Sequence, residues 1–303
     1  MHSLTVVGHR HRASVRGGGV PVFRVGGYGR RAGLSVVARV TAALCLLVST
    51  GCGSKPEPLS VLPPGGRHVL FIGNSLTYVH NLPATVAAIA QLAGDTFRVA
   101  MEAGPNLALI DHLKGASNAV EIVRQGGWDY VVLSQGPTPR GICRDSLVLW
   151  TKMFEPLIRG VGAKPALYMT WPAVNQHSWF DDVRISFQQA AAAVNGVFLP
   201  AGEAWRSAWA EDPNLQLYGG DGFHPSEIGT FLAALEIYER ISGRDVRTLP
   251  PRAFSDGLPL TLPEATVRLL QQAAHAANAQ FPALPASAAP PQDAVTTSAR
   301  AQC

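Results

Sequence analysis

The chain has 303 residues, 15% of them charged, a size and composition typical of one compact domain with appendages rather than of two domains. Seven of its 25 basic residues and none of its 21 acidic residues precede Cys52, so the chain from Cys52 onward carries 18 basic against 21 acidic residues, a net charge of about −3. A nucleic-acid-binding domain would carry its basic excess on the folded part. We therefore exclude nucleic acid as a partner.

Residues 1–51 have the layout of an export signal. Arg30, Arg31 and Arg39 precede an apolar run over 40–48, which is too short to span a bilayer, and small residues then lead to Cys52. Gly51-Cys52 resembles the lipobox of bacterial lipoproteins, in which cleavage before the cysteine leaves that cysteine to carry lipid. The segment predicts an exported protein, membrane-anchored through lipid on Cys52. The alternative is an ordinary cleaved signal that yields a secreted or periplasmic protein without lipid.

The composition of the chain after the leader predicts three segments: a tether, a folded domain and a tail. Residues 52–66 are rich in Pro, Gly and Ser and predict a tether, and residues 67–282 carry the domain. Residues 283–303 contain few large apolar side chains and predict a disordered tail. Cys143 and Cys303 alone remain outside the leader and the lipid anchor, too few for a disulfide framework, and no Cys/His group has the spacing of metal ligands. The sequence therefore predicts no metal and no cofactor.

Within 67–282, apolar runs alternate with amphipathic stretches. Short apolar runs predict buried strands over 68–72, 96–101, 130–133, 166–170 and 197–199. Helices are predicted over 82–93, 107–125, 143–160, 180–194, 203–211, 226–241 and 262–279. This alternation predicts an α/β fold, a three-layer α/β/α sandwich with a parallel, five-stranded sheet. In such sheets ligands bind beyond the carboxyl ends of the strands.

The first candidate for chemistry is Ser75, in Gly73-Asn74-Ser75 directly after the first predicted strand. A serine at a strand end faces the substrate region with backbone N–H groups beside it. Gly73 permits a sharp exit from the strand. The structural alternative is a helix-capping turn, in which Asn and Ser are common. The segment also lacks the second Gly of the G-x-S-x-G nucleophile elbow of α/β-hydrolases.

The second candidate is the pair Asp221 and His224, in Asp-Gly-Phe-His-Pro before a long amphipathic helix. A serine hydroxyl is a poor nucleophile until an imidazole takes its proton, and a carboxylate fixes the tautomer of that imidazole. A spacing of three residues on a loop places both side chains near one site. The structural alternative is that Asp221 is a turn residue and that His224 caps the helix.

Taken together, a strand-end G-N-S early in the chain and a D-x-x-H-P late in it resemble the SGNH (GDSL-like) hydrolase superfamily. The resemblance covers roughly residues 67–242 and implies an SGNH/flavodoxin-like fold. In that superfamily the serine attacks, the histidine is the base and the aspartate orients the histidine. The resemblance therefore implies that Ser75, His224 and Asp221 form a catalytic triad.

The superfamily holds the oxyanion with three donors: the serine N–H, a glycine N–H after the second strand and an asparagine side chain after the third. The resemblance implies Ser75 and Gly104 as the first two. After the third predicted strand this chain has Ser134-Gln135-Gly136 and lacks the expected G-x-N-D. Gln135 offers the same amide on a side chain one methylene longer, so we take it as the third donor. The alternative is a strand-end residue that satisfies loop backbone.

Other polar and aromatic residues carry weaker signals. His68, His80, His112 and His177 lack partners at suggestive spacing and are expected to be structural or exposed. Trp171 follows the fourth predicted strand and is expected either to line the acyl or alcohol pocket or to pack a loop.

The sequence thus predicts a serine esterase that acts through a triad and an acyl-enzyme. Substrates expected of an exported member are short acyl esters, such as O-acetyl groups on carbohydrate, or small lipid esters. Two alternatives stay open: a non-catalytic module of the same fold that binds glycan or lipid, and an SGNH-type O-acyltransferase, in which a sugar hydroxyl replaces water.

Overall fold

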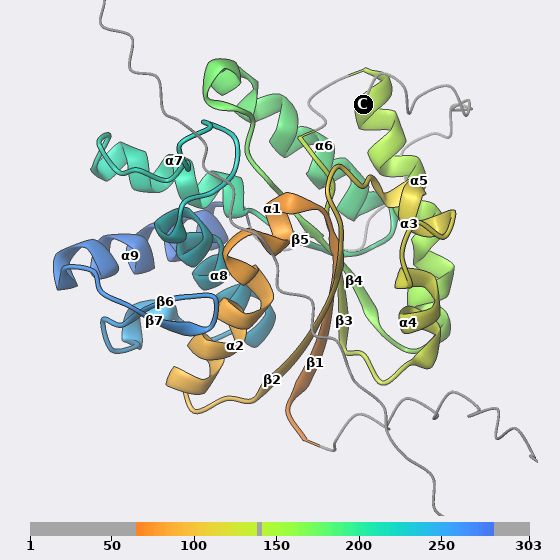
Figure 1. Ribbon diagram of the computed structural model, residues 1–303, viewed down its shortest axis with the longest axis horizontal. Helices are drawn as coiled ribbons and strands as arrows, with labels where there is room; N and C mark the ends of the chain where they lie inside the picture. Colours follow the sequence, from red (N-terminus) through yellow and green to blue (C-terminus); the bar gives the residue numbers. More distant parts are fainter. Residues whose placement is uncertain (1–64, 138–140, 282–303) are drawn as a thin grey trace, which may run out of the picture. The chain divides into compact units, whose positions relative to one another are not determined.

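The computed structural model describes residues 65–137 and 141–281 (Figure 1). The predicted leader, the predicted lipid anchor at Cys52, the predicted tether up to residue 64 and the predicted tail after residue 281 lie outside the described residues. Cys143, near the start of helix α5, is disulfide-bonded and is not a free thiol. Among the described residues no helix is both long and apolar enough to cross a bilayer.

The core of the fold is a five-stranded parallel sheet in the order β2-β1-β3-β4-β5. The strands are β1 (Arg67–Gly73), β2 (Phe97–Ala103), β3 (Tyr130–Leu133), β4 (Lys164–Tyr168) and β5 (Val197–Leu199). This is the flavodoxin-like order, in which the chain moves to opposite sides of β1 and creates a switch point between β1 and β3. The predicted fold class is confirmed, and Ser75 follows the strand that borders the switch point.

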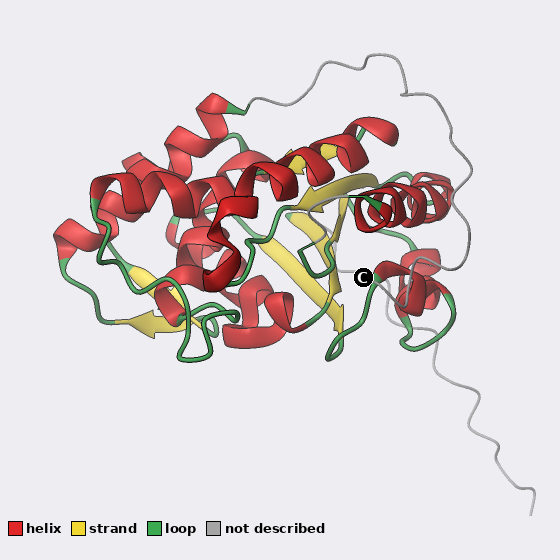
Figure 2. Ribbon diagram, turned by 90° about the horizontal axis from the view of Figure 1, so that it is seen from above, coloured by secondary structure: helices red, strands yellow, loops and turns green. Residues whose placement is uncertain are grey.

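Helices cover both faces of the sheet. On one face α2, α7, α8 and α9 pack together, and on the other α5 packs against α3, α4 and α6, so the sheet lies between two helical layers (Figures 1 and 2). The helices are α1 (Ser75–Tyr78), α2 (Leu82–Leu92), α3 (Leu109–Leu113), α4 (Ala119–Gln125), α5 (Ile142–Gly160), α6 (Phe180–Ala193), α7 (Ala201–Glu211), α8 (Glu227–Ser242) and α9 (Glu264–Gln280). Because both faces are covered, Val69 to Ile72 of β1 are completely buried and read as one apolar run.

Two features differ from the sequence prediction. The single helix predicted over 107–125 is two helices, α3 and α4, because Gly115 adopts φ +87° and the chain leaves the helical conformation there. A small hairpin, β6 (Ala253–Ser255) and β7 (Leu258–Leu260), was not predicted. Its turn is Asp256-Gly257 with φ values of 53° and 77°, the left-handed pair that Asp-Gly favours in two-residue hairpins.

Helix α8 is buried along most of its length between α2, α7 and α9, and it contains a carboxyl group in the protein interior. The Glu236 side chain is fully buried, and among the described residues neither carboxyl oxygen has a hydrogen-bond partner. Burial is the main cause that raises the pKa of Glu236 to about 8, because an ionised carboxylate loses its hydration there. Glu236 is therefore protonated in the folded protein at neutral pH.

This buried carboxyl predicts a pH-dependent stability. Below pH 4.5 Glu236 is protonated in both states, so its contribution to stability is fully present. As pH rises towards 8 only the unfolded state ionises, and this contribution is progressively lost. Glu236→Gln cannot ionise. We therefore expect its free energy of unfolding, relative to wild type, to rise by about 4 kcal/mol between pH 5 and pH 8. Urea titrations of both proteins at the two pH values measure this difference, and parallel pH profiles would contradict it.

Candidate active site

Ser75 is the first residue of α1, immediately after the carboxyl end of β1. Asn74 caps this short helix: its Oδ1 accepts from Leu76 N (3.1 Å), and its Nδ2 donates to Leu107 O (3.3 Å). A Cβ at Gly73 would collide with the Thr77 hydroxyl, so the sharp exit from the strand requires glycine. The turn expected from the sequence is confirmed, and it anchors Ser75 to two parts of the chain.

The Ser75 main chain offers an unused donor. The N–H groups of Leu76, Thr77 and Tyr78 all bond to Asn74, to its side chain or to its carbonyl. Within the described chain the Ser75 N–H has no acceptor, and its hydroxyl has no partner either. Ser75 is only 7% exposed, so these two groups lie at a sheltered position. An unpaired N–H beside a hydroxyl is the arrangement that a nucleophile with an oxyanion hole needs.

Asp221 and His224 lie on a loop that is closed like a hairpin before α8. Tyr218 and Pro225 form an antiparallel bridge, and Gly219 N donates to His224 O (2.8 Å). Gly222 has φ +67°, which lets the chain reverse between the two candidate residues. The loop thus holds both side chains at the same tip.

The structure brings Asp221 and His224 into direct contact. Asp221 Oδ2 lies 2.5 Å from His224 Nδ1, while Oδ1 accepts the N–H groups of Phe223 (3.0 Å) and His224 (2.9 Å). The bond to the His224 side chain is the main cause that lowers the pKa of Asp221 to about 2. An ionised carboxylate only accepts, so Nδ1 carries a proton and Nε2 of the neutral ring is free to act as a base.

The Ser75 turn and the loop that carries Asp221 and His224 are both hydrogen-bonded to residues at the end of β4. The Tyr168 hydroxyl, at the end of β4, donates to Leu76 O (3.3 Å), next to Ser75. Trp171, three residues later, donates from Nε1 to Phe223 O (3.1 Å), next to His224. The described structure contains no hydrogen bond between Ser75 and His224 themselves. The contacts from one strand end nevertheless hold both residues at the carboxyl edge of the sheet.

Aromatic side chains pack against the loop that carries Asp221 and His224. Trp171 is fully buried and stacks on Trp205 with 3.6 Å between ring centroids. The Tyr218 hydroxyl donates to Pro172 O (2.6 Å), and its ring packs edge-on against Trp205. Of the two roles expected for Trp171, the structure shows loop packing.

The two remaining oxyanion candidates differ in their hydrogen bonds. Gly104 N donates to Gly73 O at 3.4 Å, a long bond that continues the pairing of β1 with β2. Gln135 is 2% exposed, and its Oε1 accepts from Leu109 N (3.2 Å). Because a main-chain N–H only donates, this bond fixes the amide orientation and turns Nε2 away from Leu109. Nε2 has no partner among the described residues, so Gln135 retains a free donor while Gly104 does not.

His112, which was expected from the sequence to be structural or exposed, is a buried side chain bonded to the end of β1. It is fully buried, its Nε2 lies 2.9 Å from Gly73 O, and its Nδ1 lies 2.7 Å from the Ser117 hydroxyl. Since a carbonyl only accepts, Nε2 carries the proton, and burial lowers the pKa of His112, which favours the neutral ring. No spacing connects His112 to Gly73 in the sequence; only the topology brings them together.

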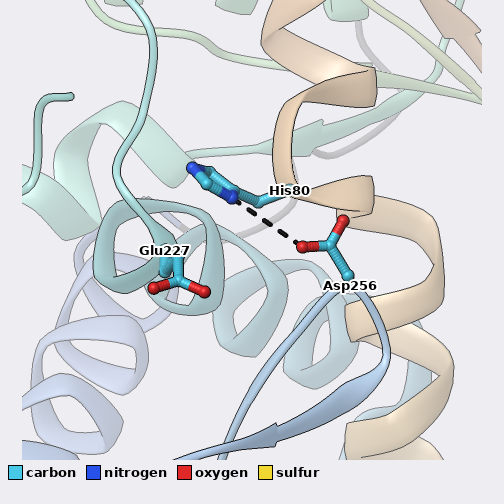
Figure 3. Close-up of side chains that lie close together, drawn as sticks. All are labelled: His80, Glu227 and Asp256. Atoms are coloured by element: carbon cyan, nitrogen blue, oxygen red, sulfur yellow. Dashed lines mark ion pairs between the residues drawn. The ribbon is translucent and has the colours of Figure 1, made fainter. Parts of the chain in front are cut away.

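A second group of ionisable side chains lies next to the candidate triad in the sequence. His80 comes five residues after Ser75, Glu227 three residues after His224, and Asp256 lies in the β6–β7 turn. Figure 3 shows the three side chains converging, with His80 Nδ1 3.8 Å from Asp256 Oδ2. Both carboxylates are exposed, so we describe this His80 cluster as a surface feature.

Comparisons with known proteins give structural relatives only. No family model and no curated protein matches the sequence. A DUF4886 family protein from Bacteroides uniformis has a TM-score of 0.61 at 18% identity, over 72% of this chain and 96% of its own. A proposed SGNH hydrolase from Slackia heliotrinireducens has 25% identity and a TM-score of 0.48, over 58% and 99% of the two chains. For an acetylxylan esterase from Geobacillus stearothermophilus the values are 16% and 0.45, over 61% and 97%.

The structural relatives include SGNH and GDSL-like hydrolases. The likeness to the Bacteroides protein is one of fold, and it agrees with the three-layer architecture that the sequence predicted.

The Asp221–His224 contact predicts that replacing the Asp221 carboxylate by an amide lowers activity. In Asp221→Asn the side-chain oxygen keeps the two main-chain bonds, but the amide donates to Nδ1 and stabilises the wrong imidazole tautomer. We expect kcat for ester hydrolysis to fall by roughly 10⁴. Because the pKa of Asp221 is about 2, the wild-type residue is ionised throughout pH 5–9, and the loss should persist across that range. Asp212→Asn, in another surface turn, is the control; recovery of the first variant at high pH would contradict the assignment.

Proposed function

We propose that this protein is an SGNH-type serine hydrolase that cleaves carboxylic esters through an acyl-enzyme. The observation that carries the proposal is the Asp221–His224 pair, whose Nε2 is left free and whose loop is fastened, through Trp171, to the strand end that also holds the Ser75 turn. An ionised carboxylate, an oriented imidazole and a sheltered hydroxyl are the three groups that activated serine chemistry requires.

The proposed reaction has two steps. His224 Nε2 takes the proton of the Ser75 hydroxyl as its oxygen attacks the ester carbonyl, and the same histidine then protonates the leaving alcohol. In the second step His224 takes a proton from water, the resulting hydroxide attacks the acyl-enzyme, and Ser75 regains its proton as the acid leaves. Asp221 holds the ring orientation and stabilises the imidazolium in both steps without becoming protonated.

The oxyanion is proposed to bind at three donors, which differ in whether they already make another hydrogen bond. The Ser75 N–H and the Gln135 amide have no partner in the described structure and need no rearrangement. The Gly104 N–H must first leave Gly73 O, but that carbonyl also receives the shorter bond from His112. Releasing Gly104 therefore leaves no buried carbonyl unpaired, which avoids a cost of about 1–3 kcal/mol.

The proposed substrates are short acyl esters, such as O-acetyl groups on carbohydrates, or small lipid esters. Next to the triad, the Val174 side chain lies against Gly222 and is 56% exposed, which offers a small apolar contact for an acyl group. The leader and Gly51-Cys52 support export, with a lipid anchor on Cys52 as the proposed link to a membrane.

The decisive test is hydrolysis of p-nitrophenyl acetate, butyrate and octanoate by wild type and by Ser75→Ala. We expect turnover to fall by roughly 10⁶ in the variant, because the nucleophile is absent. Ser134→Ala is a matched control, since Ser134 is also buried at a strand end and its hydroxyl has no partner in the described chain. It should retain activity, and the preferred acyl length will indicate the size of the pocket.

Equal turnover by wild type and Ser75→Ala would contradict the triad. A folded wild type that hydrolyses none of the three esters would instead favour the binding module or the acyltransferase. Product analysis with an acetyl donor and an acceptor sugar separates those two.

The proposed role of Gln135 can be tested separately, because its Oε1 accepts from Leu109 N while its Nε2 is the proposed donor to the oxyanion. Gln135→Glu keeps an oxygen for Leu109 N but removes the free amide donor. If the amide binds the oxyanion, kcat should fall by roughly 10²–10³ with little change in KM. Gln135→Asn, which retains an amide, should lose less activity. Full activity in Gln135→Glu would show that the residue only caps α3.

A further inference from the structure

An open surface pocket of about 320 Å³ lies between the ends of α8 and α9, and none of its lining residues belongs to the candidate triad. Its lining includes two carboxylates, Glu239 and Asp245, the imidazole of His275 and the polar side chains of Asn278 and Arg240. These residues come from α8, from the segment before the short 3₁₀ helix η3 (Val246–Thr248), and from α9. Nothing in the ester-hydrolysis mechanism uses them.

Three of these side chains have the separations of metal ligands. His275 Nδ1 lies 2.9 Å from Glu239 Oε1 and 3.6 Å from Asp245 Oδ1, and one ligand atom of each lies within 4.8 Å of the others. A metal with bonds of about 2.0–2.2 Å to nitrogen and oxygen places neighbouring ligands roughly 2.8–3.6 Å apart. The two measured separations from the imidazole fall within that range. A cation can therefore replace the Nδ1 proton with little movement of these atoms.

Both carboxylates are held in place by outer hydrogen bonds. Val246 N donates to Glu239 Oε2 (2.9 Å), so Oε1 is the oxygen that faces His275. The Arg247 guanidinium holds both oxygens of Asp245, with Nε 2.9 Å from Oδ1 and NH2 2.6 Å from Oδ2, so it fixes this carboxylate while its positive charge opposes a bound cation. Hydrogen bonds of this kind to ligating carboxylates are typical of protein metal sites, because they fix ligand orientation before the metal binds.

Two further polar side chains, those of Asn278 and Arg240, line the same pocket. Asn278 is 9% exposed, and its Oδ1 has no hydrogen-bond partner within the described residues. This oxygen has almost no solvent-exposed surface, and the Asn278 amide group donates to Glu236 O (3.1 Å), so Asn278 borders the pocket without being a ligand. Arg240 acts against a cation, but its NH2 group is held by the carbonyls of Asn278 and Phe281. We therefore expect moderate rather than tight affinity.

The His80 cluster is the weaker candidate. Its two carboxylates are exposed, and His80 Nδ1 lies 3.8 Å from Asp256 Oδ2, longer than either separation at His275 (Figure 3). It nevertheless provides a matched control, because it also contains one imidazole and two carboxylates.

We propose that Glu239, Asp245 and His275 form a binding site for one divalent transition-metal ion of the Zn²⁺ type. A mixed nitrogen and oxygen set that includes imidazole favours such ions over Mg²⁺ and Ca²⁺, which prefer oxygen alone. The site is structural: Glu239 follows His224 by 15 residues, most of them in α8, which corresponds to about 20 Å along that helix. A bound ion joins α8, η3 and α9, and the proposal is independent of the esterase proposal.

The test is calorimetric titration of the untagged, metal-free full chain with ZnCl₂, for wild type, His275→Gln, Asp245→Asn and His80→Asn. Asparagine suits position 80, where φ is +52°. We expect wild type and His80→Asn to bind one Zn²⁺ that both other variants bind at least 10-fold more weakly. At a free Zn²⁺ concentration 100 times Kd, Tm should rise by roughly 5–10 °C in wild type and in His80→Asn.

Three results would overturn the proposal. The first is that wild type shows no saturable Zn²⁺ binding. The second is that His275→Gln and Asp245→Asn both bind Zn²⁺ as wild type does. The third is that only His80→Asn loses binding, which would assign the ion to the His80 cluster. Unfolding curves without metal show whether each variant is folded, and Asp245→Asn decides the question if His275→Gln is not. Ester hydrolysis by wild type with and without Zn²⁺ is a separate readout, and we expect it to be the same.

Discussion

One main-chain carbonyl, that of Gly73, connects the parts of the fold on which the candidate active site depends. It ends the central strand β1, and it accepts hydrogen bonds from His112 at the start of the α3–α4 segment and from Gly104 after β2. The same residue has no space for a Cβ beside Thr77, so α1 begins close against the strand. The position of Ser75 is thus set by three neighbours at once, and a shift of any of them moves its hydroxyl group.

The loop that carries His224 depends on a different strand, β4. Tyr168 and Trp171, at and after the end of β4, contact the Ser75 turn and the His224 loop respectively, and both side chains are essentially buried. Burial raises the pKa of Tyr168, so its hydroxyl stays protonated and keeps donating to Leu76 O. A buried hydroxyl and a buried indole N–H each need a partner, and here the partners are carbonyls beside the two candidate catalytic residues. The same two buried side chains therefore pack in the core and fix the positions of the Ser75 turn and the His224 loop.

Most of the fold was predictable from the sequence because buried parallel strands are apolar runs. Tyr130–Leu133 and Val197–Leu199 were predicted to the residue, and the other strands to within two. The break at Gly115 was missed because apolar periodicity continues across it, and the β6–β7 hairpin was missed because three-residue strands are too short to show alternation. At the site, local motifs indicated Ser75, Asp221 and His224. The roles of His112 and Trp171 arise from contacts between distant segments, which no spacing in the sequence reveals.

The loop that carries Asp221 and His224 is exposed to solvent, and this exposure bears on the size of ester that could reach it. Asp221 and His224 have side chains that are 52% and 33% exposed, while Ser75 is only 7% exposed. A base that stands open to solvent is reachable from outside, so an ester group need not enter a closed chamber to meet it. If the proposed chemistry holds, a bulky carrier such as a polymer chain can remain in the surrounding water while one of its substituents is removed.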